Sequence, residues 1–174
     1  MHNPSNKHPF LAILLLPALV STAQDVQIRK RAKAENPTLA ITRFDGDSAI
    51  HTRLKQTLIQ CDWFSVVSGN AATYRVAARH RRGSGEELSL RVSDASGATF
   101  DIGRTAPAGS VDKVIFTSVD ALISKLFGVP GLCASRIAFA MGGRSAMKEV
   151  YLANFDGTGM TRVTHNSTIS TEPS

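Results

Sequence analysis

Cysteine, tryptophan and long hydrophobic runs are scarce in this sequence of 174 residues, and each shortage excludes a class of protein. Two cysteines cannot build the dense disulfide scaffold of a small secreted domain, and neither CxxC nor another metal-ligand spacing occurs. The motifs GxSxG and HExxH are also missing. No apolar run reaches the roughly twenty residues that a membrane-spanning helix needs. The sequence therefore predicts no enzyme, no metal, no cofactor and no transmembrane segment.

The residues that are present favour a folded domain. Hydrophobic residues make up 43% of the chain and charged residues 20%, which is enough to form a core. The net charge of +6 permits contact with an anionic surface. Aromatic residues are not interleaved with the arginines, so no nucleic-acid platform is predicted. The charge is densest in a basic cluster that consists of Arg75, Arg79, His80, Arg81 and Arg82. Two interpretations of this cluster are a solvated strand face and a binding surface for an anionic partner.

The first 23 residues have the features of a secretory signal peptide. Lys7 precedes the apolar run 10–20, which is too short to span a bilayer. Ser21 and Ala23 are the small residues that signal peptidase accepts, so we expect cleavage after Ala23 and export of the chain. Export would place Cys61 and Cys133 where disulfides can form, but their spacing leaves open whether they pair or remain free thiols.

Hydrophobic periodicity next predicts an α/β domain. A strand is expected at 38–44, followed by a helix from its N-cap Asp47 to Gln60. A short strand at 63–67 and three strands joined by tight turns, between Ala72 and Arg104, are expected to form an antiparallel meander. A second amphipathic helix, 111–127, is expected to be capped by Ser110. Two helices on a mixed sheet of about five strands make one two-layer domain.

The pattern changes after Gly131 to short strands at 136–141 and 149–154, joined by hairpin signals without a helix. Roughly forty residues cannot bury an independent core. Three histidines follow the predicted cleavage site, His51, His80 and His165, and none has the spacing of a metal ligand or a catalytic base.

Several segments resemble the TolB family, the periplasmic component of the Tol-Pal cell-envelope system. The resemblance is strongest where helix end 126–131 (LFGVPG) leads into 135–139 (SRIAF), and it continues through 149–157 (EVYLANFDG) and 162–164 (RVT). The last two segments are similar to the family's β-propeller blade signature. The resemblance implies a signal peptide at 1–23, an α/β domain at 24–131 and an incomplete β-propeller blade at 132–174.

The resemblance implies that the protein functions by binding partner proteins. In the family, the mature amino terminus can bind the periplasmic domain of the inner-membrane protein TolA, and the propeller binds the lipoprotein Pal. A Pal-like partner is therefore expected only with a full propeller, in a periplasmic scaffold that maintains outer-membrane integrity and supports cell division. Carried over to this sequence, the candidate TolA-binding residues are Gln24, Asp25, Val26, Gln27, Ile28 and Arg29.

Two alternatives remain open at this point. The chain can be the start of a TolB-like protein that carries a hydrolase farther along, because propeller modules of this kind occur beside peptidases. It can also be an inactive product of a truncated gene. A nucleophile elbow downstream would favour the first alternative, and rapid proteolysis of residues 132–174 would favour the second.

Overall fold

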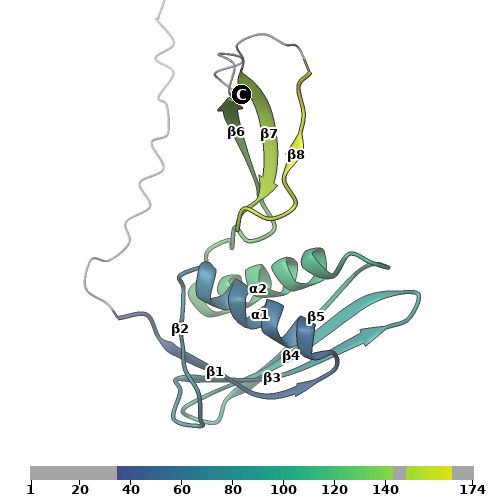
Figure 1. Cartoon of the computed structure of the whole chain (residues 1–174). Coiled ribbons are helices and arrows are strands. Elements are labelled where there is room, and N and C mark those ends of the chain that lie inside the picture. Colours follow the sequence, from purple (N-terminus) through teal and green to yellow (C-terminus); the bar gives the residue numbers. More distant parts are fainter. Residues whose placement is uncertain (1–34, 143–147, 166–174) are drawn as a thin grey trace, which may run out of the picture. The chain divides into compact units, whose positions relative to one another are not determined.

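The computed structural model describes residues 35–142 and 148–165 of the chain. Two helices and eight strands lie in this described part (Figure 1). Their order is β1 (Thr38–Asp45), α1 (Ser48–Gln60), β2 (Ser65–Val66), β3 (Tyr74–Arg82), β4 (Gly85–Asp94), β5 (Thr99–Pro107), α2 (Val111–Phe127), β6 (Arg136–Gly142), β7 (Lys148–Asn154) and β8 (Thr161–Arg162). The predicted signal peptide and the candidate TolA-binding residues, Gln24 to Arg29, lie outside the described residues.

The first five strands form one mixed sheet in the order β2-β1-β3-β4-β5. Strand β1 pairs in parallel with both β2 and β3, and the remaining pairs are antiparallel. Both helices cover the same face of this sheet, and no helix of the described residues covers the other face (Figure 1). The predicted two-layer α/β domain with an antiparallel meander is therefore confirmed.

Each helix begins and ends for an identifiable local reason. The Asp47 side chain accepts a hydrogen bond from the amide of Ala49 at 2.8 Å, which confirms the predicted N-cap of α1. Helix α2 has the predicted bounds and ends at Gly128, whose φ of 71° suits glycine. Ser110 occupies the predicted N-cap position of α2, but its side chain makes no capping hydrogen bond. Its backbone carbonyl instead accepts the first helical hydrogen bond, from Val114.

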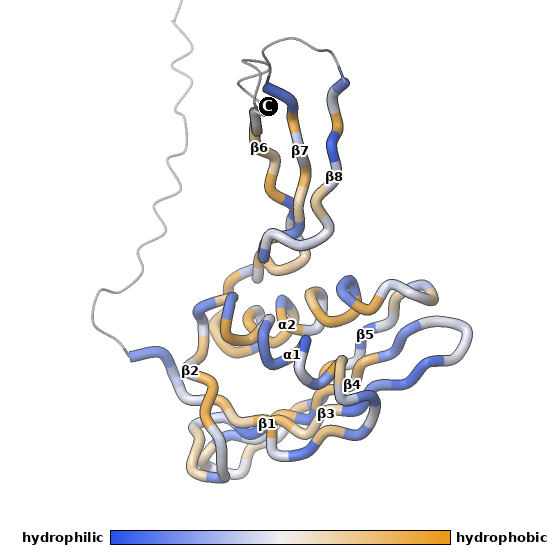
Figure 2. Tube along the Cα trace, viewed as in Figure 1, coloured by the Kyte–Doolittle hydropathy of each residue, from blue (hydrophilic) through white to orange (hydrophobic). Residues whose placement is uncertain are grey.

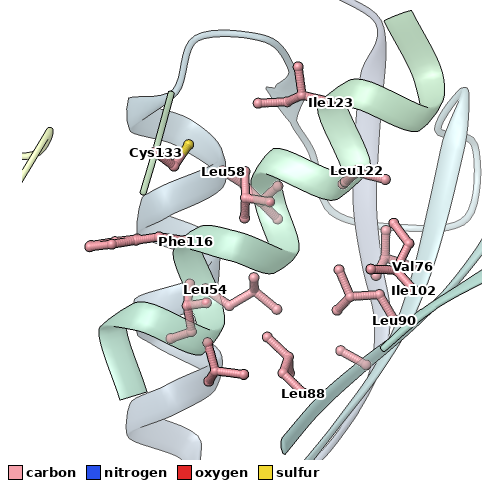
Figure 3. Packing of buried hydrophobic residues seen from close by; sticks show 14 of the residues in the cluster. Leu54, Leu58, Val76, Leu88, Leu90, Ile102, Phe116, Leu122, Ile123 and Cys133 are labelled. Atoms are coloured by element: carbon pink, nitrogen blue, oxygen red, sulfur yellow. The ribbon is translucent and has the colours of Figure 1, made fainter. Parts of the chain in front are cut away.

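The core lies between the helix pair and the covered face of the sheet. Figure 3 shows side chains from α1, α2 and strands β3, β4 and β5 meeting in this layer. Hydrophobic residues run along α2, whereas hydrophilic residues dominate the tip of the β3–β4 hairpin (Figure 2). The largest side chains without exposed surface include Leu54 and Leu58 of α1, Leu88 of β4, and Leu122 and Ile123 of α2. The apolar side chains that alternate along the strands therefore pack against the apolar stripes of the two helices in one core.

Strands β6, β7 and β8 form a separate three-stranded antiparallel sheet. Strand β7 lies in the middle, and its connection to β8 contains a turn at Gly157, whose φ is 79°. The expected strands at 136–141 and 149–154 are confirmed within one residue at an end. Among the described residues of this sheet, only Glu149 and Ala153 are buried.

Candidate interaction surfaces

The chain enters the α/β domain through a short anchored segment. The side-chain amide of Asn36 donates to the carbonyl oxygen of Asp62 at 2.9 Å, and the carbonyl of Pro37 accepts a hydrogen bond from Ser65 at 3.0 Å. Strand β1 then starts between β2 and β3, so its first residues have pairing strands on both sides. Residues 36 and 37 are therefore held at the start of the sheet.

The predicted basic cluster does not form one surface. Alternation along β3 divides it, because Arg79 and Arg81 point to the uncovered face whereas His80 is buried on the helix-covered side. The residue types of the cluster do not indicate this division. The two-residue spacing of Val76, Ala78 and His80 does indicate it, because it places all three side chains on the same face of β3.

The uncovered sheet face carries almost balanced charge. A shallow hollow of about 540 Å³ lies on it, lined by four arginines and three carboxylates: Arg43, Arg79, Arg81, Arg91, Asp45, Glu87 and Asp101. Two of the arginines are paired, since Arg79 contacts Asp45 at 2.8 Å and Arg91 forms two bonds to Asp101 at 2.8 and 3.1 Å. These pairs are exposed, so solvent and salt weaken them. The arrangement favours a solvated face over a concentrated anion-binding site.

Glu86 is a buried charged residue that the sequence reasoning did not single out. Its carboxylate has no exposed surface and receives three hydrogen bonds, from His80 Nε2 at 2.9 Å, Arg82 Nε at 3.1 Å and the amide of Gly109 at 3.0 Å. Burial raises the pKa of Glu86, but the bonds from Gly109, His80 and Arg82 outweigh it and bring the pKa below its ordinary value. The carboxylate thereby ties the β3–β4 hairpin to the loop before α2.

The position of Glu86 was readable from the sequence by one signal. Glu86 has the same parity along β4 as Leu88, Leu90 and Val92, all of which are buried. A charged residue on the apolar side of an alternating strand indicates a buried partner, which here is His80. His80 thus bonds a carboxylate in the core.

Arg53 forms a second cluster, on α1. Its guanidinium contacts Asp112 Oδ1 at 2.7 Å, Asp156 Oδ2 at 2.6 Å and Thr158 Oγ1 at 3.2 Å. The same guanidinium lies 5.2 Å from the ring centre of Phe116, and Phe116 meets Phe155 edge to face at 5.2 Å. Residues of the turn after β7 therefore contact both helices.

Asp156 is the buried partner in this cluster. Its side chain has no exposed surface, and it accepts bonds from the amide and hydroxyl of Thr158 at 3.0 and 2.7 Å. Burial raises the pKa of Asp156, but the Thr158 bonds and the Arg53 charge outweigh this and lower it. The acidic turn after β7, which contains Asp156, thus supplies a charged contact to α1 of the α/β domain.

The other two histidines of the described residues, His51 and His165, lie in separate environments. His51 stacks on Phe44 with ring centres 5.0 Å apart, and His165 is exposed after β8. Among residues 35–142 and 148–165, no three His, Cys, Asp or Glu side chains gather in a way that could hold a metal ion. Cys61 and Cys133 are both free thiols, at the C-cap of α1 and in the connector after α2, respectively. No helix in the described part is both long and apolar enough to cross a bilayer.

Comparison with known proteins identifies a sequence relative and a structural neighbour that are both TolB proteins. The chain is 35% identical over 89 residues to the Tol-Pal system protein TolB of Desulfosudis oleivorans, which is 50% of this chain and 20% of the relative. The structure is similar to the crystal structure of TolB from Acinetobacter baumannii, with a TM-score of 0.68 and 19% identity, over 77% of this chain and 40% of that one. No family model matches the chain. The chain thus spans about a fifth of the length of the curated relative.

Proposed function

Because this chain belongs to the TolB family, we propose that it is a non-enzymatic binding protein of the periplasm that acts in a Tol-Pal system. The observation that carries the proposal is the 35% identity to a Tol-Pal system protein over 89 residues. The two-layer α/β fold, which resembles that of a solved TolB, supports it. In this role the chain binds envelope proteins, helps to maintain the outer membrane and supports cell division after removal of residues 1–23.

The partner-binding segment in this proposal is Gln24 to Arg29, which binds an inner-membrane TolA-like protein by adding a strand to its sheet. Val26 and Ile28 alternate with polar residues, as an added strand requires. Strand β1 supports the same assignment, because its first residues are paired on both sides and offer no free edge. In this proposal a partner strand would therefore pair with residues before Glu35 and not with β1.

A pull-down with the periplasmic domain of TolA from the same organism tests the segment. Deletion of residues 24–33 should abolish capture, and unchanged capture would contradict the mechanism. Val26→Ser together with Ile28→Ser should weaken capture strongly, because both side chains would face the partner sheet. Gln27→Ser is the matched control, since its side chain would face solvent. Circular dichroism of each variant should be unchanged, because the α/β core begins at Leu39.

We further propose that residues 132–174 are the beginning of a β-propeller and that residues 24–131 form the preceding domain. The three-stranded antiparallel sheet β6-β7-β8 and its acidic turn support this division. A Pal-like lipoprotein would bind only a chain that carries the remaining blades. The mass of the endogenous exported protein tests this proposal: peptides beyond Ser174 would support it, and a mass equal to residues 24–174 would contradict a complete propeller.

A further inference from the structure

The two cysteines, far apart in the sequence, lie together at the edge of the core. Cys61 is the C-cap residue of α1 and is half-buried, with its Sγ 3.2 Å from the carbonyl oxygen of Leu58. Cys133 is 2% exposed and belongs to the hydrophobic core cluster, against which Cys61 packs. The two thiols are near enough that each changes the pKa of the other. Figure 3 shows the sulfur of Cys133 next to α1.

The backbone holds Cys133 in this place through helix α2. One oxygen of Asp120 accepts the amide of Cys133 at 2.7 Å, and the other accepts the amide of Ala134 at 2.9 Å. Gly131 lies so close to the same helix that an added Cβ would be 2.5 Å from the Cα of Asp120. The connector is thus clamped on α2 by two charge-assisted hydrogen bonds and a close backbone approach.

We infer that Cys61 and Cys133 form an intramolecular disulfide when a disulfide oxidant is present. The bond would join the end of α1 to the connector between α2 and β6, and it would close a loop that contains most of the α/β domain. A long closed loop lowers the entropy of the unfolded chain, so the oxidised protein should be more stable than the reduced one.

The two thiols have unequal roles in the reaction. The neighbouring Cys133 thiol lowers the pKa of Cys61, whereas the Cys61 thiol, together with burial, raises the pKa of Cys133. Cys61 is also the more exposed of the two. The Cys61 thiolate is therefore the group that attacks first.

The exchange balances as two successive thiol–disulfide steps. The Cys61 thiolate attacks one sulfur of the oxidant, here a low-molecular-weight disulfide such as oxidised glutathione, and one reduced thiolate leaves. Cys133 then loses its proton to solvent and attacks the Cys61 sulfur, and the second reduced thiolate leaves. Both cysteines are oxidised, the oxidant disulfide is reduced to two thiols, and no other reactant is needed.

The test uses the purified chain with oxidised glutathione, so it does not depend on export or on any binding partner. Titration of thiols in denaturant and intact mass should change from two free thiols to none, with the loss of two hydrogen atoms and no glutathione attached. Peptide mapping should recover one cross-linked pair containing Cys61 and Cys133. Two unreacted thiols, or a glutathione adduct that persists on the wild-type chain, would overturn the inference.

Single substitutions separate the two roles. Cys133→Ser should leave a stable glutathione adduct on Cys61, because no second thiol can displace it. Cys61→Ser should leave Cys133 unmodified in the folded chain, since Cys133 is buried. Thermal unfolding of the wild type should rise on oxidation and return on reduction, while neither variant should show the rise. A lower unfolding temperature for the cross-linked wild type would contradict a bond that fits the native geometry.

Discussion

The α/β domain and the β6-β7-β8 sheet bury their hydrophobic residues to very different extents. In the former, five strands and two helices enclose a continuous cluster that includes Leu54, Leu88 and Leu122, all without exposed surface. In the latter, Ile137 of β6 is 48% exposed, and Val163 after β8 is 50% exposed. The first region therefore has its own core, whereas the second depends on contacts with neighbouring groups.

Buried charged residues have a different structural role in each region. In the α/β domain, Glu86 joins a hairpin to a loop within a structure that the hydrophobic core already holds. At the three-stranded sheet, Asp156 pairs with Arg53 of α1, so an ionic contact connects the turn after β7 to the domain. Where a segment has no hydrophobic core of its own, polar contacts contribute a larger share of its stability.

The sharpest test of this contrast compares two large-to-small substitutions. Leu122→Ala should destabilise the chain by about 2–5 kcal/mol, because it removes a fully buried side chain and leaves a cavity. Ile137→Ala should cost about 1 kcal/mol or less, because the side chain is about half exposed. Urea unfolding followed by circular dichroism measures both. Equal losses would remove the distinction between the two regions.

The next largest effect is expected at Asp156. Asp156→Ala should cost about 2–3 kcal/mol, because it removes a buried charged acceptor from Arg53 and Thr158. Amide exchange should accelerate in β7 and little in β4. Asp156→Asn is the matched control, since it retains an oxygen for the Thr158 bonds but removes the charge that faces Arg53. An unchanged exchange rate in β7 with Asp156→Ala would show that the ionic contact does not hold the turn.

The pH dependence of stability tests the buried charge inside the α/β domain. Since the pKa of Glu86 is lower in the folded state than its ordinary value of 4.5, the stabilisation is present above that pH. It is lost as the pH falls through the lowered folded pKa. Glu86→Gln should therefore be less stable than the wild type at pH 7, and the two should converge in acid. Thermal unfolding across this range measures the difference, and a constant gap would contradict the assignment.

Periodicity predicted the elements because local patterns determine them. The alternation of Leu88, Leu90 and Val92 and the stripe of α2 are visible in the chain, and the structure confirms both. Strand order was not predictable, because nothing local states that β3 pairs with β1 rather than with β2. The Arg53–Asp156 pair was not predictable for a similar reason, since its two residues are far apart in the sequence and meet only in the folded chain.

The smallest expected effect concerns how the two helices of the α/β domain begin. Asp47→Ala should cost about 1 kcal/mol, because the aspartate side chain satisfies the free amide of Ala49 at the start of α1. Ser110→Ala should have almost no effect, because the serine side chain makes no such bond at the start of α2. Both sequences look alike at this level, with a polar residue before an amphipathic helix, so only the geometry distinguishes them. Urea unfolding of the two variants measures the difference, and a loss with Ser110→Ala as large as that with Asp47→Ala would mean that the serine caps α2 in solution after all.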